Sequence, residues 1–114
     1  MQKTVEIVYN PEAVVRIGEF MPYVKAAVGL GIDAGRRLGV SIDKVGVGLF
    51  KSYEDPDYWE IVLTFLGPSD RGKRLALMDD LSGAIAKWSK EQPQPVQALF
   101  LRVASEVKPS TSNV

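Results

Sequence analysis

The chain contains no cysteine and no histidine. Without cysteine there can be no disulfide framework, thiolate nucleophile or iron–sulfur cluster, and without histidine the usual proton shuttle and zinc ligand are missing. Catalysis would have to rely on carboxylates, hydroxyls, lysine and arginine, and a metal could be held only through oxygen. We therefore expect no cofactor and no metal, and no residues stand out as a catalytic group.

Net charge and long apolar runs are also missing. The 14 basic and 14 acidic residues cancel, so no overall field attracts phosphate backbones or anionic membranes. The longest uncharged apolar stretch, residues 26–32, falls far short of the ~20 residues that cross a bilayer. Glu6 interrupts the region where a secretory leader would be apolar. These features predict a cytoplasmic protein with no membrane partner and argue against nucleic acid.

What is present is an ordinary globular composition. Of 114 residues, 46% are hydrophobic and 25% are charged. A chain of this length forms one domain and buries about two thirds of its surface on folding. We expect a single α+β domain over residues 1–107 and a disordered tail over residues 108–114, where proline and small polar residues replace the hydrophobic pattern.

Alternating residues predict four strands, and apolar residues spaced by three and four predict two helices. The strands are expected over residues 3–9, 44–50, 58–65 and 96–107, with the second and third forming a hairpin. The first helix should begin at Pro11 and end before Gly39, with a kink or break near Pro22, which lacks the N–H of an interior position. The second helix should begin after Asp70 and end before Gln92.

The order strand, helix, hairpin, helix, strand predicts a ferredoxin-like βαββαβ fold. In that fold a four-stranded antiparallel sheet carries two helices on one face. Both crossover connections can then take the strongly preferred right hand. Because this architecture hosts unrelated functions, it implies no activity by itself.

The string most suggestive of a ligand lies between the third predicted strand and the second predicted helix. Residues 67–73 fit the phosphate-loop pattern G-x-x-x-x-G-K, but Arg74 stands where a magnesium-binding hydroxyl is required. Nucleotide hydrolysis is therefore disfavoured. A polar turn that caps the helix is the favoured interpretation, and capture of an anion by the helix N-terminus remains open. The candidate anion-binding residues are Ser69, Arg71, Gly72, Lys73 and Arg74.

Small residues also form a stripe in the first predicted helix. Residues 29–34 fit the dinucleotide pattern G-x-G-x-x-A, but they lie inside a helix and not at a turn between a strand and a helix. Gly31 and Gly35 are spaced by four, which puts them on one side of the helix. We expect this stripe to pack inside the domain, because it lies next to the apolar positions Val28 and Ile32.

The sheet face opposite the helices is predicted to mix large apolar and charged side chains. An uncovered face of this kind suggests a partner. Stacking of single-stranded RNA fits less well, because Glu6 and Glu60 lie among the aromatic residues. The candidate interface residues are Phe50, Tyr58, Val62, Phe100 and Arg102.

The sequence thus favours a non-enzymatic interaction or regulatory module over an enzyme. We expect it to self-associate, or to bind a protein partner, through the open sheet face or an edge strand. The alternative is that a phosphorylated ligand or a nucleic acid binds at the N-terminus of the second helix.

Overall fold

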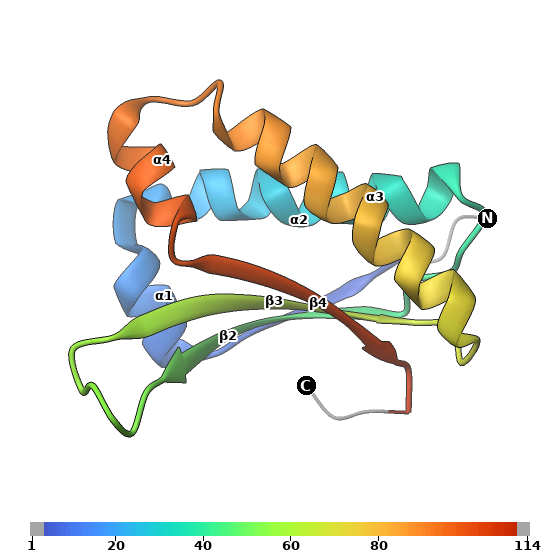
Figure 1. Cartoon of the computed structure of the whole chain (residues 1–114), viewed down its shortest axis with the longest axis horizontal. Helices are drawn as coiled ribbons and strands as arrows, with labels where there is room; N and C mark the ends of the chain where they lie inside the picture. Colours follow the sequence, from blue (N-terminus) through green and yellow to red (C-terminus); the bar gives the residue numbers. More distant parts are fainter. Residues whose placement is uncertain (1–3, 112–114) are drawn as a thin grey trace.

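The computed structural model of the chain describes residues 4–111. Its four strands form one sheet in the order β1-β2-β3-β4, and the helices form a second layer over one face of that sheet (Figure 1). The elements, in chain order, are β1 (Glu6–Tyr9), α1 (Pro11–Ile17), the 3₁₀ turn η1 (Gly18–Phe20), α2 (Met21–Arg37), β2 (Lys44–Lys51), β3 (Trp59–Gly67), α3 (Arg71–Ser89), α4 (Gln94–Phe100) and β4 (Val103–Pro109).

The sheet is mixed and not antiparallel. β2 and β3 form an antiparallel hairpin at its centre, β1 pairs with β2 in parallel, and β4 pairs with β3 in parallel. The predicted ferredoxin-like antiparallel fold is therefore wrong. The α+β class and the four-stranded sheet are as predicted, but the strands have different neighbours.

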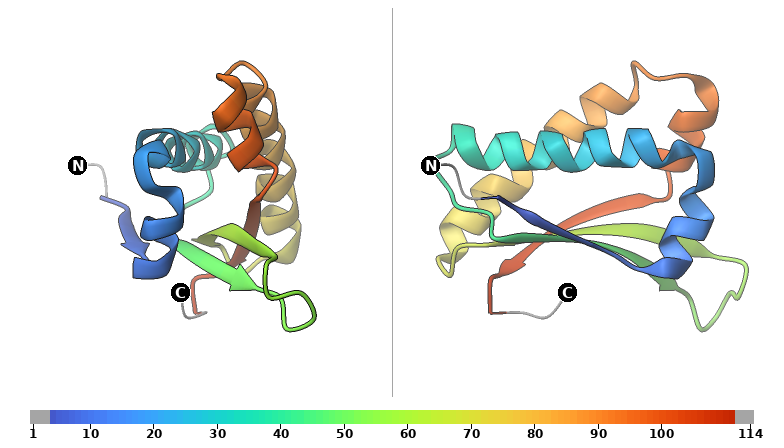
Figure 2. Two further views of the ribbon diagram at one scale, coloured as in Figure 1. Left: turned by 90° about the vertical axis from the view of Figure 1, so that its left-hand side faces the viewer. Right: turned by 180° about the vertical axis from the view of Figure 1, so that it is seen from behind.

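The order of strands differs because chain order alone does not say which strands lie side by side. The ferredoxin-like order lets both crossovers on one face be right-handed. In the observed order the two parallel pairs run in opposite directions, so two crossovers over the same face must have opposite hands (Figure 2). β1, which has four residues, lies at the edge of the sheet beside the longer β2.

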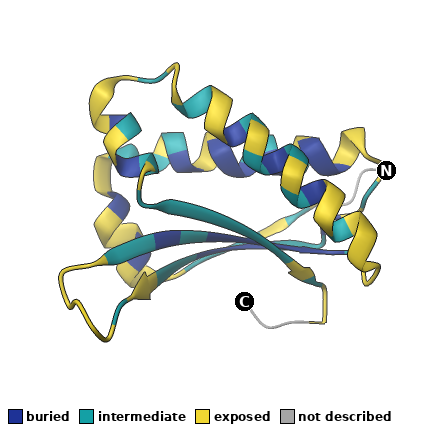
Figure 3. Cartoon of the chain, viewed as in Figure 1, coloured by how far each residue is buried: buried dark blue, intermediate teal, exposed yellow. Residues whose placement is uncertain are grey.

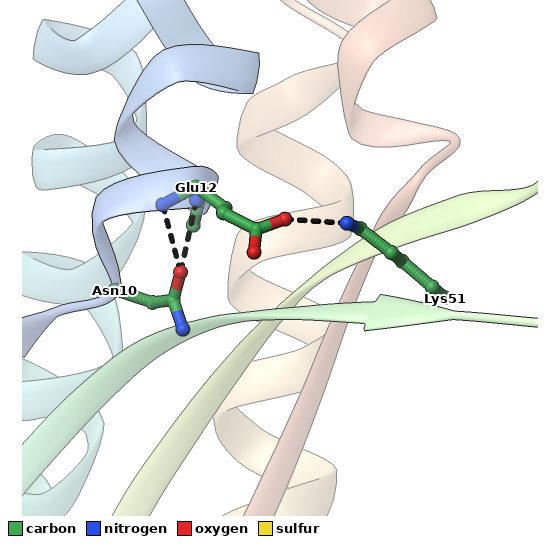
Figure 4. A network of polar contacts seen from close by, with 4 residues as sticks. Asn10, Glu12 and Lys51 are labelled. Atoms are coloured by element: carbon green, nitrogen blue, oxygen red, sulfur yellow. Dashed lines mark hydrogen bonds and ion pairs between the residues drawn. The ribbon is translucent and has the colours of Figure 1, made fainter.

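Local chemistry explains where the first helices begin and end. The Asn10 side chain accepts hydrogen bonds from the N–H groups of Glu12 and Ala13, which caps α1 (Figure 4). Gly18, at a φ of 55°, ends α1, because that conformation is open to glycine. Pro22 lies in the first turn of α2, where no N–H is needed. The predicted break near Pro22 is confirmed.

The core lies between the helices and the covered face of the sheet (Figure 3). Ile61, Leu63 and Phe65 of β3 are fully buried there. A Cβ atom on Gly31 would lie 2.3 Å from the Phe65 ring, so α2 approaches the sheet as closely as glycine permits. The predicted packing of this stripe inside the domain is confirmed. Ala13 and Ile17 are the buried residues of α1, whereas Val14 is exposed.

The last predicted strand, residues 96–107, begins too early. Residues 94–100 form α4, which buries Val96 and Leu99 three positions apart and has Pro95 in its first turn. Phe100 therefore lies in the helix layer, where its ring packs edge-on against Trp88 with centroids 5.2 Å apart. It does not lie on the open sheet face, so its predicted place there is wrong.

The strand β4 extends past the predicted end of the domain. Lys108 and Pro109 pair with residues of β3, and the Ser110 N–H donates to the Gly67 carbonyl. Part of the predicted tail thus belongs to the sheet, while its last residues, 112–114, lie outside the described chain. Within residues 4–111, no helix has the length and apolarity to cross a membrane.

Candidate functional site

One face of the sheet is left uncovered by the helix layer (Figure 1). We call it the open face. Strand alternation and the pairing register assign its side chains. They are Glu6 and Val8 of β1, Lys44, Gly46, Gly48 and Phe50 of β2, Glu60, Val62, Thr64 and Leu66 of β3, and Ala104, Glu106 and Lys108 of β4.

A trough crosses the middle of the open face. Gly46 and Gly48 form its floor, and the space above them is a hollow of about 420 Å³ that Phe50 and Val62 also line. Among residues 4–111, and apart from its chain neighbours, a Cβ atom on Gly48 would meet only the Val62 carbonyl oxygen, at 3.9 Å. A second hollow of about 350 Å³ continues across Val62 toward β4. Two strand glycines thus make a depression in a surface that side chains would otherwise fill.

Phe50 lies at one end of the trough. Its side chain is 50% exposed, although it is large and apolar. The preceding residue on the same face of β2 is Gly48, so the ring has little same-face packing along its own strand. Phe50 is therefore the apolar group of the open face best placed to contact another molecule.

The half of the open face away from Phe50 is mainly polar, and its Thr64, Glu106 and Lys108 side chains also line the trough. The Thr64 hydroxyl donates to a Glu106 carboxylate oxygen at 2.8 Å, and the Lys108 ammonium lies 3.5 Å from that oxygen. Lys44 and Glu6 form a looser pair at 3.8 Å. Each acidic group here lies close to a basic one, so this half presents no excess of either sign.

Tyr58 and Arg102 lie together at the margin of the open face. The Arg102 guanidinium is 6.0 Å from the Tyr58 ring and 4.9 Å from the Trp59 ring, and it donates to the Trp59 carbonyl. The Tyr58 hydroxyl donates to the Glu60 carboxylate, and this hydrogen bond raises the pKa of the phenol above its usual value. The cluster thus ties the hairpin to the start of β4.

The structure brings together four of the five predicted interface residues. Phe50 and Val62 line the trough, Tyr58 and Arg102 lie at its margin, and Phe100 lies in the helix layer. The prediction missed the two glycines of the trough floor. The signal was present in the alternation of glycine with core residues over 44–50, since a glycine within a strand often marks the close approach of another group.

The structure also gathers the predicted anion-binding residues at the start of α3. There the Asp70 carboxylate accepts the Lys73 N–H at 2.9 Å and so caps the helix. Arg74 donates to the backbone carbonyls of Pro68 and Ser69. Arg71 and Gly72 occupy the first turn and are exposed. The Asp70 carboxylate thus occupies the place at the helix N-terminus where an anion would bind. Anion binding by these residues stays a prediction.

Across residues 4–111, no three acidic side chains converge in a way that could hold a metal ion. Searches against protein-family models, curated proteins and solved structures find no match to this chain.

Proposed function

We propose that this chain is a non-enzymatic interaction module that self-associates through its open face. The observation that carries the proposal is the trough over Gly46 and Gly48 with the half-exposed Phe50 at its end. A depression beside an exposed aromatic ring on the same surface is the combination that a self-complementary contact requires.

The positions of ring and trough on one strand support a two-fold arrangement. In a two-fold contact each patch meets its own copy, so a residue and its target exchange roles between the subunits. An axis near Gly48 would set Phe50 of each copy over the glycines of the other. The missing side chains at these glycines would let the two sheets approach closely there.

The charges of the open face support a second copy as the occupant. A surface with an excess of one sign would repel itself across a two-fold axis. The open face and its margin carry acidic and basic residues in equal number: Glu6, Glu60 and Glu106 against Lys44, Lys108 and Arg102. Such a face meets a copy of itself without net repulsion.

Sedimentation equilibrium tests the proposal. We expect the wild type to form dimers in the high micromolar range, and Phe50→Glu to remain monomeric because the dimer would bury an unpaired carboxylate. Gly48→Val should also remain monomeric, since its side chain would fill the trough. Val15→Glu is the matched control: Val15 is 79% exposed on α1, in the helix layer, and its substitution should leave the dimer unchanged.

Two results would overturn the proposal. One is a wild type that stays monomeric at about 0.5 mM, the weak end of specific association. The other is a dimer that forms equally well in Phe50→Glu and Gly48→Val.

A further inference from the structure

The outer edge of β4 is a second surface, distinct from the open face. β4 is the last strand of the sheet. The Ile61 N–H donates to the Arg102 carbonyl at 2.7 Å, and the register pairs Ile61 with Val103. In a parallel pair this pattern directs the backbone groups of even-numbered β4 residues toward β3, so those of Val103, Ser105 and Val107 point outward. They form a row of donors and acceptors on which another strand can pair.

A hollow of about 500 Å³ runs beside this edge. Ile85 and Ala86 of α3, Phe100 of α4, and Val103 and Ser105 of β4 contribute to its lining. In Figure 1, α3 lies above β4 and diverges from it toward α4, and the hollow lies between these three elements. A strand added to β4 would therefore direct alternate side chains into the hollow, toward the helix layer.

Apolar groups remain exposed along the same edge. Leu101, at the mouth of the hollow, is 89% exposed, and Leu75 of α3 is 55% exposed. Leu75 and Met78 line a smaller hollow of about 230 Å³ beside Val107, at the far end of β4. The full length of the strand edge is thus flanked by apolar surface.

The charges along this edge are mainly basic. Arg71 and Arg74 line the far hollow, and Lys90 lines the near one. Among the acidic residues of α3, Asp80 is paired with Arg37 of α2 at 3.2 Å. Glu106 is already engaged by Thr64 and Lys108. The edge thus favours an occupant with acidic residues near its ends.

We propose that β4 accepts an extended segment of another protein as a fifth strand of the sheet. Alternate apolar side chains of that segment fill the hollow under α3, its backbone pairs with Val103, Ser105 and Val107, and its acidic ends face the basic residues of α3. This surface does not include the trough, so it can be tested separately from self-association.

The test is selection of linear peptides of about 10 residues, near the upper length of common strands, from an unbiased displayed library on immobilised wild-type protein. We expect the enriched peptides to show alternating apolar residues with acidic residues near the ends. Affinities of the synthesised winners are then measured by fluorescence anisotropy. Failure of any peptide to enrich over a protein-free surface would overturn the proposal.

Ser105→Pro is the decisive variant. It removes an outward N–H while leaving the pairing of β4 with β3 intact, so peptide affinity should fall by about tenfold or more. Ser105→Ala keeps the N–H and should bind as the wild type does. Phe50→Glu should also bind as the wild type does, which separates this surface from the open face. Equal peptide affinity for Ser105→Pro and Ser105→Ala would contradict strand addition.

Methylation of peptide backbone nitrogens gives a second measurement that leaves the protein unchanged. The peptide residues form two alternating sets, and only one set directs its N–H groups toward β4. N-methylation of that set should abolish binding, and N-methylation of the other set should have little effect. Equal loss of affinity on N-methylation of either set would overturn the proposal. If the wild type dimerises and Ser105→Pro does not, the outer edge of β4 pairs with a second copy of this chain. That result would rule out a peptide of another protein as its partner.

Discussion

The space next to a glycine differs between the two faces of the sheet. On the covered face, Gly31 of α2 lies so close to Phe65 that a Cβ atom would be 2.3 Å from the ring. On the open face, the nearest atom to a Cβ atom on Gly48, apart from its chain neighbours and within the described part of the chain, is a carbonyl oxygen at 3.9 Å. The same residue type permits close packing in one place and leaves a depression in the other. The space beside Gly31 is filled by the chain itself, whereas the space above Gly48 is available to a partner.

Of the changes considered, Gly31→Leu on the covered side should have the largest effect on stability. Phe65 is fully buried and lies 2.3 Å from the position of a Cβ atom on Gly31, so the larger side chain should cost about 3 kcal/mol of unfolding free energy. Gly29→Leu, in the same helix, is the matched control. Apart from the chain neighbours and the backbone of α2 itself, no heavy atom of residues 4–111 lies within 4 Å of a Cβ atom at Gly29. Urea denaturation measures both. Equal stability of the two variants would mean that α2 does not pack on β3 as described.

Asn10→Ala should have the next largest effect. Asn10 caps α1, which lies over the covered face, through bonds of 2.8 and 3.3 Å to two backbone N–H groups (Figure 4). Loss of the cap should lower the unfolding free energy by about 1 kcal/mol, and Asn10→Asp, which keeps an acceptor, should restore most of it. Thermal unfolding followed by circular dichroism would show this. Equal melting temperatures for all three proteins would contradict the cap.

Gly48→Val should act in the opposite direction from Gly31→Leu. A β-branched residue suits a strand, and replacing a strand glycine should stabilise the monomer by roughly 0.5–1 kcal/mol. The same change should weaken self-association, because it fills the trough. Denaturation at low concentration, where the chain is monomeric, measures the first effect. Marked destabilisation there would show that the trough is closed within the monomer.

The smallest expected effect concerns the ion pair between Lys51 of β2 and Glu12 of α1. The hydrogen bond and charge of Lys51 hold the pKa of Glu12 below its usual value. A carboxyl with a lowered pKa contributes stability above its unfolded-state pKa and loses that contribution as the pH falls through the folded-state pKa. In Lys51→Met the Glu12 pKa should rise toward its usual value, as NMR titration can measure. An unchanged titration would mean that the pair does not form in solution.

Local chemistry in the sequence predicted much of this molecule. The Asn10-Pro11 start of α1, the break near Pro22 and the central hairpin follow from capping, proline geometry and alternation. Alternation also placed four of the five candidate interface residues on the open face or at its margin, since it assigns each strand residue to a face.

The features that were missed depend on interactions distant in sequence. Leu99, Leu101 and Val103 alternate with Phe100 and Arg102 as in a strand. Val96 and Leu99 are also three apart, however, and packing in the helix layer decides for a helix over residues 94–100. The order of the strands depends on which edges meet, and neither alternation nor spacing encodes that choice. The trough was missed because its floor is formed by two glycines, which have no side chains for alternation to assign to a face.

The most direct test of the open face as an interface is NMR of the backbone amides as the protein concentration rises from about 10 µM to about 1 mM, a range that spans moderate to weak affinity. The account predicts concentration-dependent shifts at Gly46, Gly48, Phe50, Val62 and Thr64, with residues of α2 and α3 unaffected. Spectra that do not change with concentration, or changes confined to the helix layer, would contradict it.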